Sequence, residues 1–245
     1  RCVQLLSRAG RSQRAHQDHP AQLKGASSLA LTLAARCDMG ASEEVAAVWQ
    51  SLHAGARRAP SAGCGIMHAS GVALNSLTYK QTLKGWRGVA GPKAVGVHHL
   101  LRAAGGAAMA SIKLFSSIGT FFGFAGQHNY GASNAHLDHA ARCLQAQGSG
   151  AVSVQWGPWA GGGMAAAHGG LHNRMERVGL HMIQPREGLG ALRAAVSAVE
   201  GGLRGGAKMV VSAAVSVDWG TVAQAIARAP GTVPAGIKAM ARDLE

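Results

Sequence analysis

The sequence predicts an α/β fold, a single domain in which a parallel sheet is covered on both faces by helices. Short β-rich runs alternate with longer helical patterns along the chain, which is typical of strands joined by crossover helices. The 245 residues suit one sizeable core, because single cores grow to roughly 250 to 300 residues. Glycine interrupts the apolar stretches, so no window reaches the roughly 18 to 20 apolar residues of a membrane span.

Six apolar runs have the length and composition of strands. Each is followed by small or polar residues that end it. The runs span residues 3–6, 29–34, 65–69, 112–117, 151–156 and about 209–212.

Four longer patterns between these runs predict helices. The first begins near Ser42, whose hydroxyl can cap it ahead of an acidic first turn, and stops near Gly55. The second helix is expected over residues 83–101, with an interruption at Gly91-Pro92 because proline lacks the backbone N–H that a helix needs. The other two helices are expected over residues 130–147, which have a broad apolar face, and over residues 186–199.

The cysteines and histidines predict no metal site and no disulfide framework. The four cysteines, at positions 2, 37, 64 and 143, are scattered and form no C-x-x-C pair. No H-x-x-x-H pair among the twelve histidines has a carboxylate pattern that would complete a site. The chain starts at Arg1 without a signal-peptide pattern. We therefore expect an intracellular, cytoplasmic piece of a longer polypeptide.

The formal net charge of +13 raises the possibility of a nucleic-acid partner. The basic residues are spread along the chain, however, with only Arg57 and Arg58 adjacent, and no zinc-finger or RNP pattern is present. We expect a solvated basic surface and no nucleic acid. Such a surface suits an acidic carrier protein by charge complementarity.

The most informative motif joins the end of an expected strand to the start of an expected helix. Ser116 and Ser117 end the strand, a glycine-punctuated loop follows, and Asn129 and Tyr130 open the helix, with Tyr130 13 residues after Ser117. Strand, serine, glycine loop, Asn-Tyr and helix in this order resemble the short-chain dehydrogenase/reductase superfamily.

One departure from that superfamily narrows the resemblance. Most members carry a lysine four residues after the tyrosine, on the same helix face, where this chain has Asn134. In polyketide synthase ketoreductases the lysine and asparagine have exchanged places, and the lysine comes from a P-K-x-x-G segment of the preceding helix. Residues 92–96, Pro-Lys-Ala-Val-Gly, match that segment and supply Lys93. The chain thus resembles the ketoreductase domain of a modular type I polyketide synthase or fatty acid synthase.

Four further segments agree with this family in the same order. They are L-L-S-R-A-G-R at 5–11 for its second strand and cofactor loop, H-A-S-G-V at 68–72, W-G-P-W at 156–159 and D-W at 218–219. The resemblance covers residues 1 to about 225, so we interpret 1–245 as one ketoreductase catalytic domain with 226–245 as a C-terminal extension or linker. It implies a Rossmann-like, doubly wound sheet.

The resemblance implies reduction of a β-ketoacyl thioester carried on the phosphopantetheine of an acyl carrier protein, alongside other synthase domains of the same polypeptide. Tyr130 would donate the proton and Ser117 would hold the ketone oxygen. A free phenol has a pKa of about 10, so the ammonium of Lys93 would favour its ionised form after transfer. Asn134 would position the lysine or a relay water.

The resemblance also implies NADPH, bound across the carboxyl ends of the strands. Arg8 follows the second strand where an acidic residue would select NAD, and arginine suits the 2′-phosphate of NADPH. The other expected cofactor contacts are Ser7 beside Arg8, Asp38 at the adenine, His68, Ala69 and Gly71 at the adenosine side, and Pro158 and Trp159 at the nicotinamide end.

The family's opening strand and its T-G-G-x-G-x-L-G loop, which holds the pyrophosphate at a helix N-terminus, should precede Arg1 and are not in the sequence. That strand sits inside the sheet, so its neighbours would have unpaired edges. We expect the longer polypeptide to supply it, and the chain alone to bind NADPH poorly or to misfold. Two alternatives stay open: a catalytically inactive structural ketoreductase, and a free-standing reductase of a small ketone.

Overall fold

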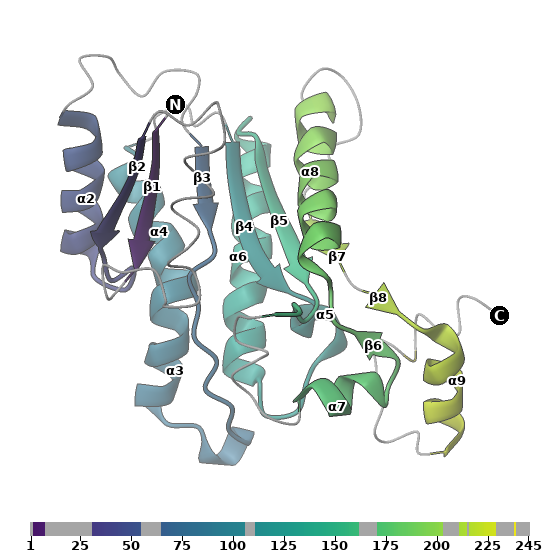
Figure 1. Ribbon diagram of the computed structural model, residues 1–245. Helices are drawn as coiled ribbons and strands as arrows, with labels where there is room; N and C mark the ends of the chain where they lie inside the picture. The colour runs from purple at the N-terminus through teal and green to yellow at the C-terminus, as the bar shows by residue number, and fades with distance from the viewer. Residues whose placement is uncertain are drawn as a thin grey trace.

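The computed structural model describes residues 2–7, 31–54, 65–105, 111–161, 171–202, 211–214, 216–228 and 238. Parallel strands run through the centre of the molecule, and the arrowheads of β1 to β5 point to the same edge (Figure 1). This architecture is the α/β fold that the sequence predicts. Arg8 lies outside the described residues.

The parallel strands form two groups. β1 (Cys2–Ser7) pairs with β2 (Leu31–Arg36). β3 (Gly65–His68), β4 (Ser111–Ser117), β5 (Ala151–Trp156) and β7 (Val211–Ala214) form a four-stranded sheet in the order β3-β4-β5-β7. Within the described residues β1 and β3 are not paired with each other.

Helices lie between the strands and follow them. They are α2 (Ser42–Ala54), α3 (Leu83–Ala90), the π-helical turn η3 (Gly91–Val95), α4 (Gly96–Ala103), α6 (His128–Ala146) and α8 (Pro185–Gly202). The boundaries of the predicted strands and helices agree with these to within about three residues. The sequence did not predict the short elements η2 (Thr78–Lys80), α5 (Gly119–Phe122), α7 (Leu171–Glu176) and α9 (Trp219–Arg228), or the antiparallel pair β6 (Leu180–His181) and β8 (Ser216–Val217).

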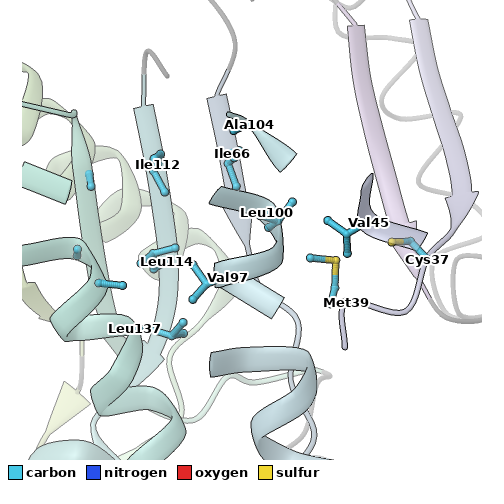
Figure 2. Packing of buried hydrophobic residues seen from close by; sticks show 13 residues of the cluster. Cys37, Met39, Val45, Ile66, Val97, Leu100, Ala104, Ile112, Leu114 and Leu137 are labelled. Atoms are coloured by element: carbon cyan, nitrogen blue, oxygen red, sulfur yellow. The ribbon is translucent and has the colours of Figure 1, made fainter. Parts of the chain in front are cut away.

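The prediction of helices on both faces of the sheet is confirmed by the packing of β5. Ala151 packs in one core cluster with Leu137 of α6, whereas the next residue, Val152, packs in another with Ala195 of α8. Because successive strand residues point to opposite faces, α6 and α8 cover opposite sides. Figure 2 shows the first cluster, which α4 joins through Val97. None of the helices in the described ranges has both the length and the apolar character of a membrane span.

The helical segment from Leu83 to Ala103 widens at Gly91–Val95 instead of breaking at Pro92. Proline has no N–H to give, and the N–H of Gly96 reaches back five residues to the carbonyl of Gly91. Such π-type turns often occur at functional sites. Here the turn buries the side chain of Lys93.

The turn fits because glycine lets α4 approach the chain after β2. A Cβ on Gly96 would lie 3.0 Å from the Cβ of Met39 and 3.1 Å from its carbonyl oxygen. The same carbonyl lies 3.1 Å from Nδ1 of His99, one turn further along α4. A methyl group at position 96 would therefore push α4 away from its neighbour.

We expect Gly96→Ala to lower the free energy of unfolding by about 1–3 kcal/mol, the usual cost of overpacking a core. Gly190→Ala is the matched control, since position 190 also lies in a helix and its added Cβ meets nothing within 4 Å. That control should gain up to about 1 kcal/mol from helix propensity. Urea unfolding of both variants measures the difference, and equal midpoints would contradict the packing.

Candidate active site

The carboxyl ends of the parallel strands bring the expected site residues to one edge of the fold (Figure 1). Ser7 ends β1, His68 ends β3 and Ser117 ends β4. Asp38 follows β2, and Pro158 follows β5. Open α/β sheets bind ligands outside this edge.

Ser117 is held in a tight turn where β4 passes into α5. Its Oγ accepts the backbone N–H of Gly119 at 3.1 Å, and its carbonyl accepts the hydroxyl of Thr120 at 2.9 Å. The hydroxyl proton of Ser117 is thereby left to donate to a group at the strand end.

Tyr130 lies in the first turn of α6 and is held by its neighbour Asn129. The Asn129 side chain accepts the backbone N–H of Tyr130 at 2.7 Å and donates to the carbonyl of Leu74 at 3.1 Å and to Gln81 Oε1 at 3.2 Å. Burial raises the pKa of the Tyr130 phenol, and hydrogen bonds with the Asn134 and Ser117 side chains oppose that rise. At neutral pH Tyr130 is therefore a protonated phenol within reach of Ser117.

Lys93 enters the same site from the π-helical turn. Its side chain is 2% exposed, its ammonium donates to the carbonyl of Phe115 on β4 at 2.8 Å, and Nζ lies 5.5 Å from the centre of the Tyr130 ring. Burial lowers the pKa of Lys93 to about 8, while the charge of Asp138 acts in the opposite direction. The lysine is thus mostly charged at neutral pH and lies beside the tyrosine.

Asn134 is fully buried one turn after Tyr130. Its Nδ2 donates to the carbonyl of Tyr130 at 2.8 Å, and its backbone carbonyl accepts the hydroxyl of Ser116 at 3.3 Å. Its Oδ1 is buried without a hydrogen-bond partner. The described contacts of Asn134 do not include Lys93, so its role in positioning that lysine stays a prediction.

His68 links β3 to the lysine turn. Its Nε2 lies 3.2 Å from the carbonyl of Lys93, and its Nδ1 is buried without a partner. Burial lowers the pKa of His68 to about 4, so the ring is neutral. An unpartnered ring nitrogen at the binding edge of the sheet fits a polar ligand group there.

The other expected cofactor residues have separate surroundings. Asp38 accepts the N–H of Gly40 at 2.9 Å in the turn after β2. Ala69 and Gly71 lie in the irregular segment after β3. Pro158 accepts the N–H of Ile183 at 2.7 Å, and the Trp159 ring lies 4.9 Å from that of Trp156, so the tryptophan packs with the core under α8.

Two polar residues of this region were not singled out from the sequence. The sequence identifies Asn129 only as part of the Asn-Tyr motif and predicts no role for its side chain. It predicts no role for Asp138, because this residue lies within a helix of ordinary amphipathic pattern. Both are buried. Polar residues at positions of this helix that are buried were the available signal. In the part of the chain that the structure describes, no three His, Cys, Asp or Glu side chains gather as metal ligands.

Comparison with known proteins agrees with this geometry. Residues 1–161 match the family model described as KR domain. The chain belongs to this ketoreductase domain family. Ketoreductases of this kind depend in general on a nicotinamide cofactor.

Relatives and solved structures place the family in polyketide synthases. The chain is 36% identical over 162 residues to polyketide synthase GfsB of Streptomyces halstedii. The matched region covers 66% of this chain and 3% of that protein. It is 35% identical over 139 residues to a 6-methylsalicylic acid synthase of Aspergillus niger, covering 56% of this chain and 8% of that protein.

Two solved ketoreductases share the fold. An A-type ketoreductase from a modular polyketide synthase has a TM-score of 0.79 and 26% identity and covers 98% of this chain. The first ketoreductase of the tylosin synthase has a TM-score of 0.77 and 27% identity and covers 99%. The chain spans 48% and 49% of those two structures, and only a small part of the synthases it matches.

We expect His68 to make stability depend on pH. Because the folded protein favours the neutral ring, His68 contributes its full stabilisation above pH 6.5 and loses it as the pH falls from 6.5 towards 4. Between pH 7 and pH 5 wild type should lose about 2 kcal/mol more than His68→Asn. Urea unfolding at both pH values measures this, with the exposed His139→Asn as the control. Parallel losses in wild type and His68→Asn would contradict the burial of a neutral ring.

Proposed function

We propose that this ketoreductase domain reduces a β-ketoacyl thioester, carried on an acyl carrier protein, to the β-hydroxyacyl thioester with NADPH. The observation that carries the proposal is the buried ammonium of Lys93 beside the ring of Tyr130, which lies in the first turn of α6, while Ser117 ends β4. Acidic carrier proteins and other synthase domains are the proposed partners, in an intracellular setting.

The chain's own residues supply the proton and the charge stabilisation that ketone reduction needs. Ser117 donates a hydrogen bond to the ketone oxygen, and Tyr130 gives that oxygen its proton. The hydride to the carbonyl carbon would come from NADPH held at the strand ends. Lys93 stabilises the tyrosinate that remains, because an ammonium close to the ring favours the ionised phenol.

Asn129 and the π-helical turn hold this arrangement in place. Asn129 fixes the first turn of α6 to the segment after β3, so Tyr130 has a defined position before substrate arrives. The bond from Lys93 to the Phe115 carbonyl fixes the ammonium against β4. Such preorganised charge is the largest contribution to catalysis in many enzymes.

The residues at the strand ends suit the proposed cofactor. His68 presents an unpartnered ring nitrogen, and Asp38 presents a carboxylate in a turn, both at the edge where such sheets bind dinucleotides. In this proposal Arg8 selects NADPH over NADH, because its guanidinium would bind the 2′-phosphate that only NADPH carries.

The alternative of a structural, inactive ketoreductase depends on the strand that carries the phosphate-binding loop in the family. β1 and β3 are not paired with each other, and none of the described strands pairs with both of them. A domain without that loop would bind the cofactor weakly. Turnover in the polypeptide that contains this chain separates the two functions.

We expect Tyr130→Phe to lower NADPH oxidation with a β-ketoacyl thioester by about 10²- to 10⁴-fold, the usual contribution of a general acid. The chain has two tyrosines, and Tyr79→Phe is the matched control because Tyr79 is 79% exposed. The loss of absorbance at 340 nm measures both in the polypeptide that contains this chain. Wild-type cofactor binding without turnover would sink the reductase and leave the structural role.

The rate should also fall at alkaline pH. Lys93 must be charged to stabilise the tyrosinate, and its pKa is about 8, so kcat should decline about tenfold per pH unit above pH 8. A pH profile at saturating substrate measures the decline. A flat profile to pH 9.5 would mean that the charge of Lys93 is not needed.

A further inference from the structure

Asp138 is a buried carboxylate that the proposed mechanism does not use. It lies on α6, two turns after Tyr130, and is 7% exposed. Its Oδ1 accepts the hydroxyl of Ser153 at 2.6 Å, and its Oδ2 accepts Nε2 of Gln155 at 2.8 Å. Both partners belong to β5, so the carboxylate ties α6 to the strand beside β4.

The same hydrogen bonds continue to the serine of the site. Gln155 Nε2 also donates to the hydroxyl oxygen of Thr120 at 2.8 Å, and the Thr120 hydroxyl donates to the carbonyl of Ser117 at 2.9 Å. Four polar groups thus run in series from Asp138 to the backbone of Ser117. Each link is short enough to fix the geometry of the next.

The negative charge of Asp138 also acts on the lysine of the site. Lys93 is a buried cation on η3, which packs against α6, and it makes no ion pair in the described residues. Burial lowers the pKa of Lys93, and the charge of Asp138 opposes that lowering. The other titratable groups around Lys93 are His68 from β3 and Tyr130 from α6, both neutral at pH 7.

We propose that Asp138 is a positioning residue for the ketoreductase reaction. It fixes the turn that carries Ser117 through Gln155 and Thr120. The inference rests on the proposed function only for its consequence for the rate. The effect of the Asp138 charge on Lys93 supports the inference, concerns the apo protein and is tested separately.

Replacement of the Asp138 carboxylate should shift the alkaline limb of the pH profile, the range of pH over which kcat declines. Asp138→Asn keeps the shape and removes the charge, so Lys93 should lose its proton at lower pH, and the limb of kcat should shift down by about one pH unit. Gln155→Met cuts the hydrogen-bond series but leaves the charge. It should lower kcat about tenfold without moving the limb. Glu43→Gln, an exposed carboxylate at the start of α2, is the control and should change neither.

A second readout does not need turnover. The ¹³Cε resonance of Lys93, assigned by its loss in Lys93→Arg, reports the ionisation of its ammonium in ¹³C-lysine-labelled protein. It should titrate about one pH unit lower in Asp138→Asn than in wild type. Asp138→Ser carries the same expectation and guards against a folding failure particular to asparagine.

The outcomes separate the inference from the proposed function. If the wild-type protein reduces the thioester and neither the limb nor the resonance moves in the Asp138 variants, the positioning role is overturned and the reductase stands. If the resonance moves but wild type reduces no thioester, the coupling of Asp138 to Lys93 is supported and the reductase is what fails.

Discussion

The burial of the Lys93 ammonium is the constraint on which the rest of the site depends. A charged amine that is 2% exposed is costly unless the protein replaces water around it. This chain does so with the carbonyl of Phe115, the face of the Tyr130 ring and the charge of Asp138. Phe115 belongs to β4, and Tyr130 and Asp138 both belong to α6. A change in any of these elements therefore changes the surroundings of the Lys93 ammonium.

The parallel sheet explains why residues far apart in sequence meet. Each crossover returns the chain to the same edge, where His68 ends β3, Ser117 ends β4 and Pro158 follows β5. The π-helical turn then aims a lysine at that edge from a helix that precedes the tyrosine by more than thirty residues. Nδ1 of His68 and Oδ1 of Asn134 are buried polar atoms without partners in this region. Such atoms are uncommon in protein interiors and fit a site that receives a polar ligand group.

Much of this could be predicted from the sequence, and the exceptions have physical reasons. The strand at 151–156 and the helix at 42–54 carry strong local signals, an apolar run and a capped acidic start, and both were predicted closely. The lysine turn was predicted as an interruption, because proline excludes one hydrogen bond but does not reveal that the helix can widen around it. Asn129 and Asp138 were missed because their partners, Leu74 and Gln155, are set by tertiary packing and leave no local pattern. The contacts expected of Arg8 fall outside the described residues.

The central claim is that Lys93 and Tyr130, from separate helical elements, act as one unit. A double-mutant cycle on kcat for thioester reduction tests it most directly, with Lys93→Met, Tyr130→Phe and the double variant. Residues that act as a unit lose little more together than singly, so the double variant should be about as slow as the slower single one. Losses that multiply would show two independent contributions and would contradict the account.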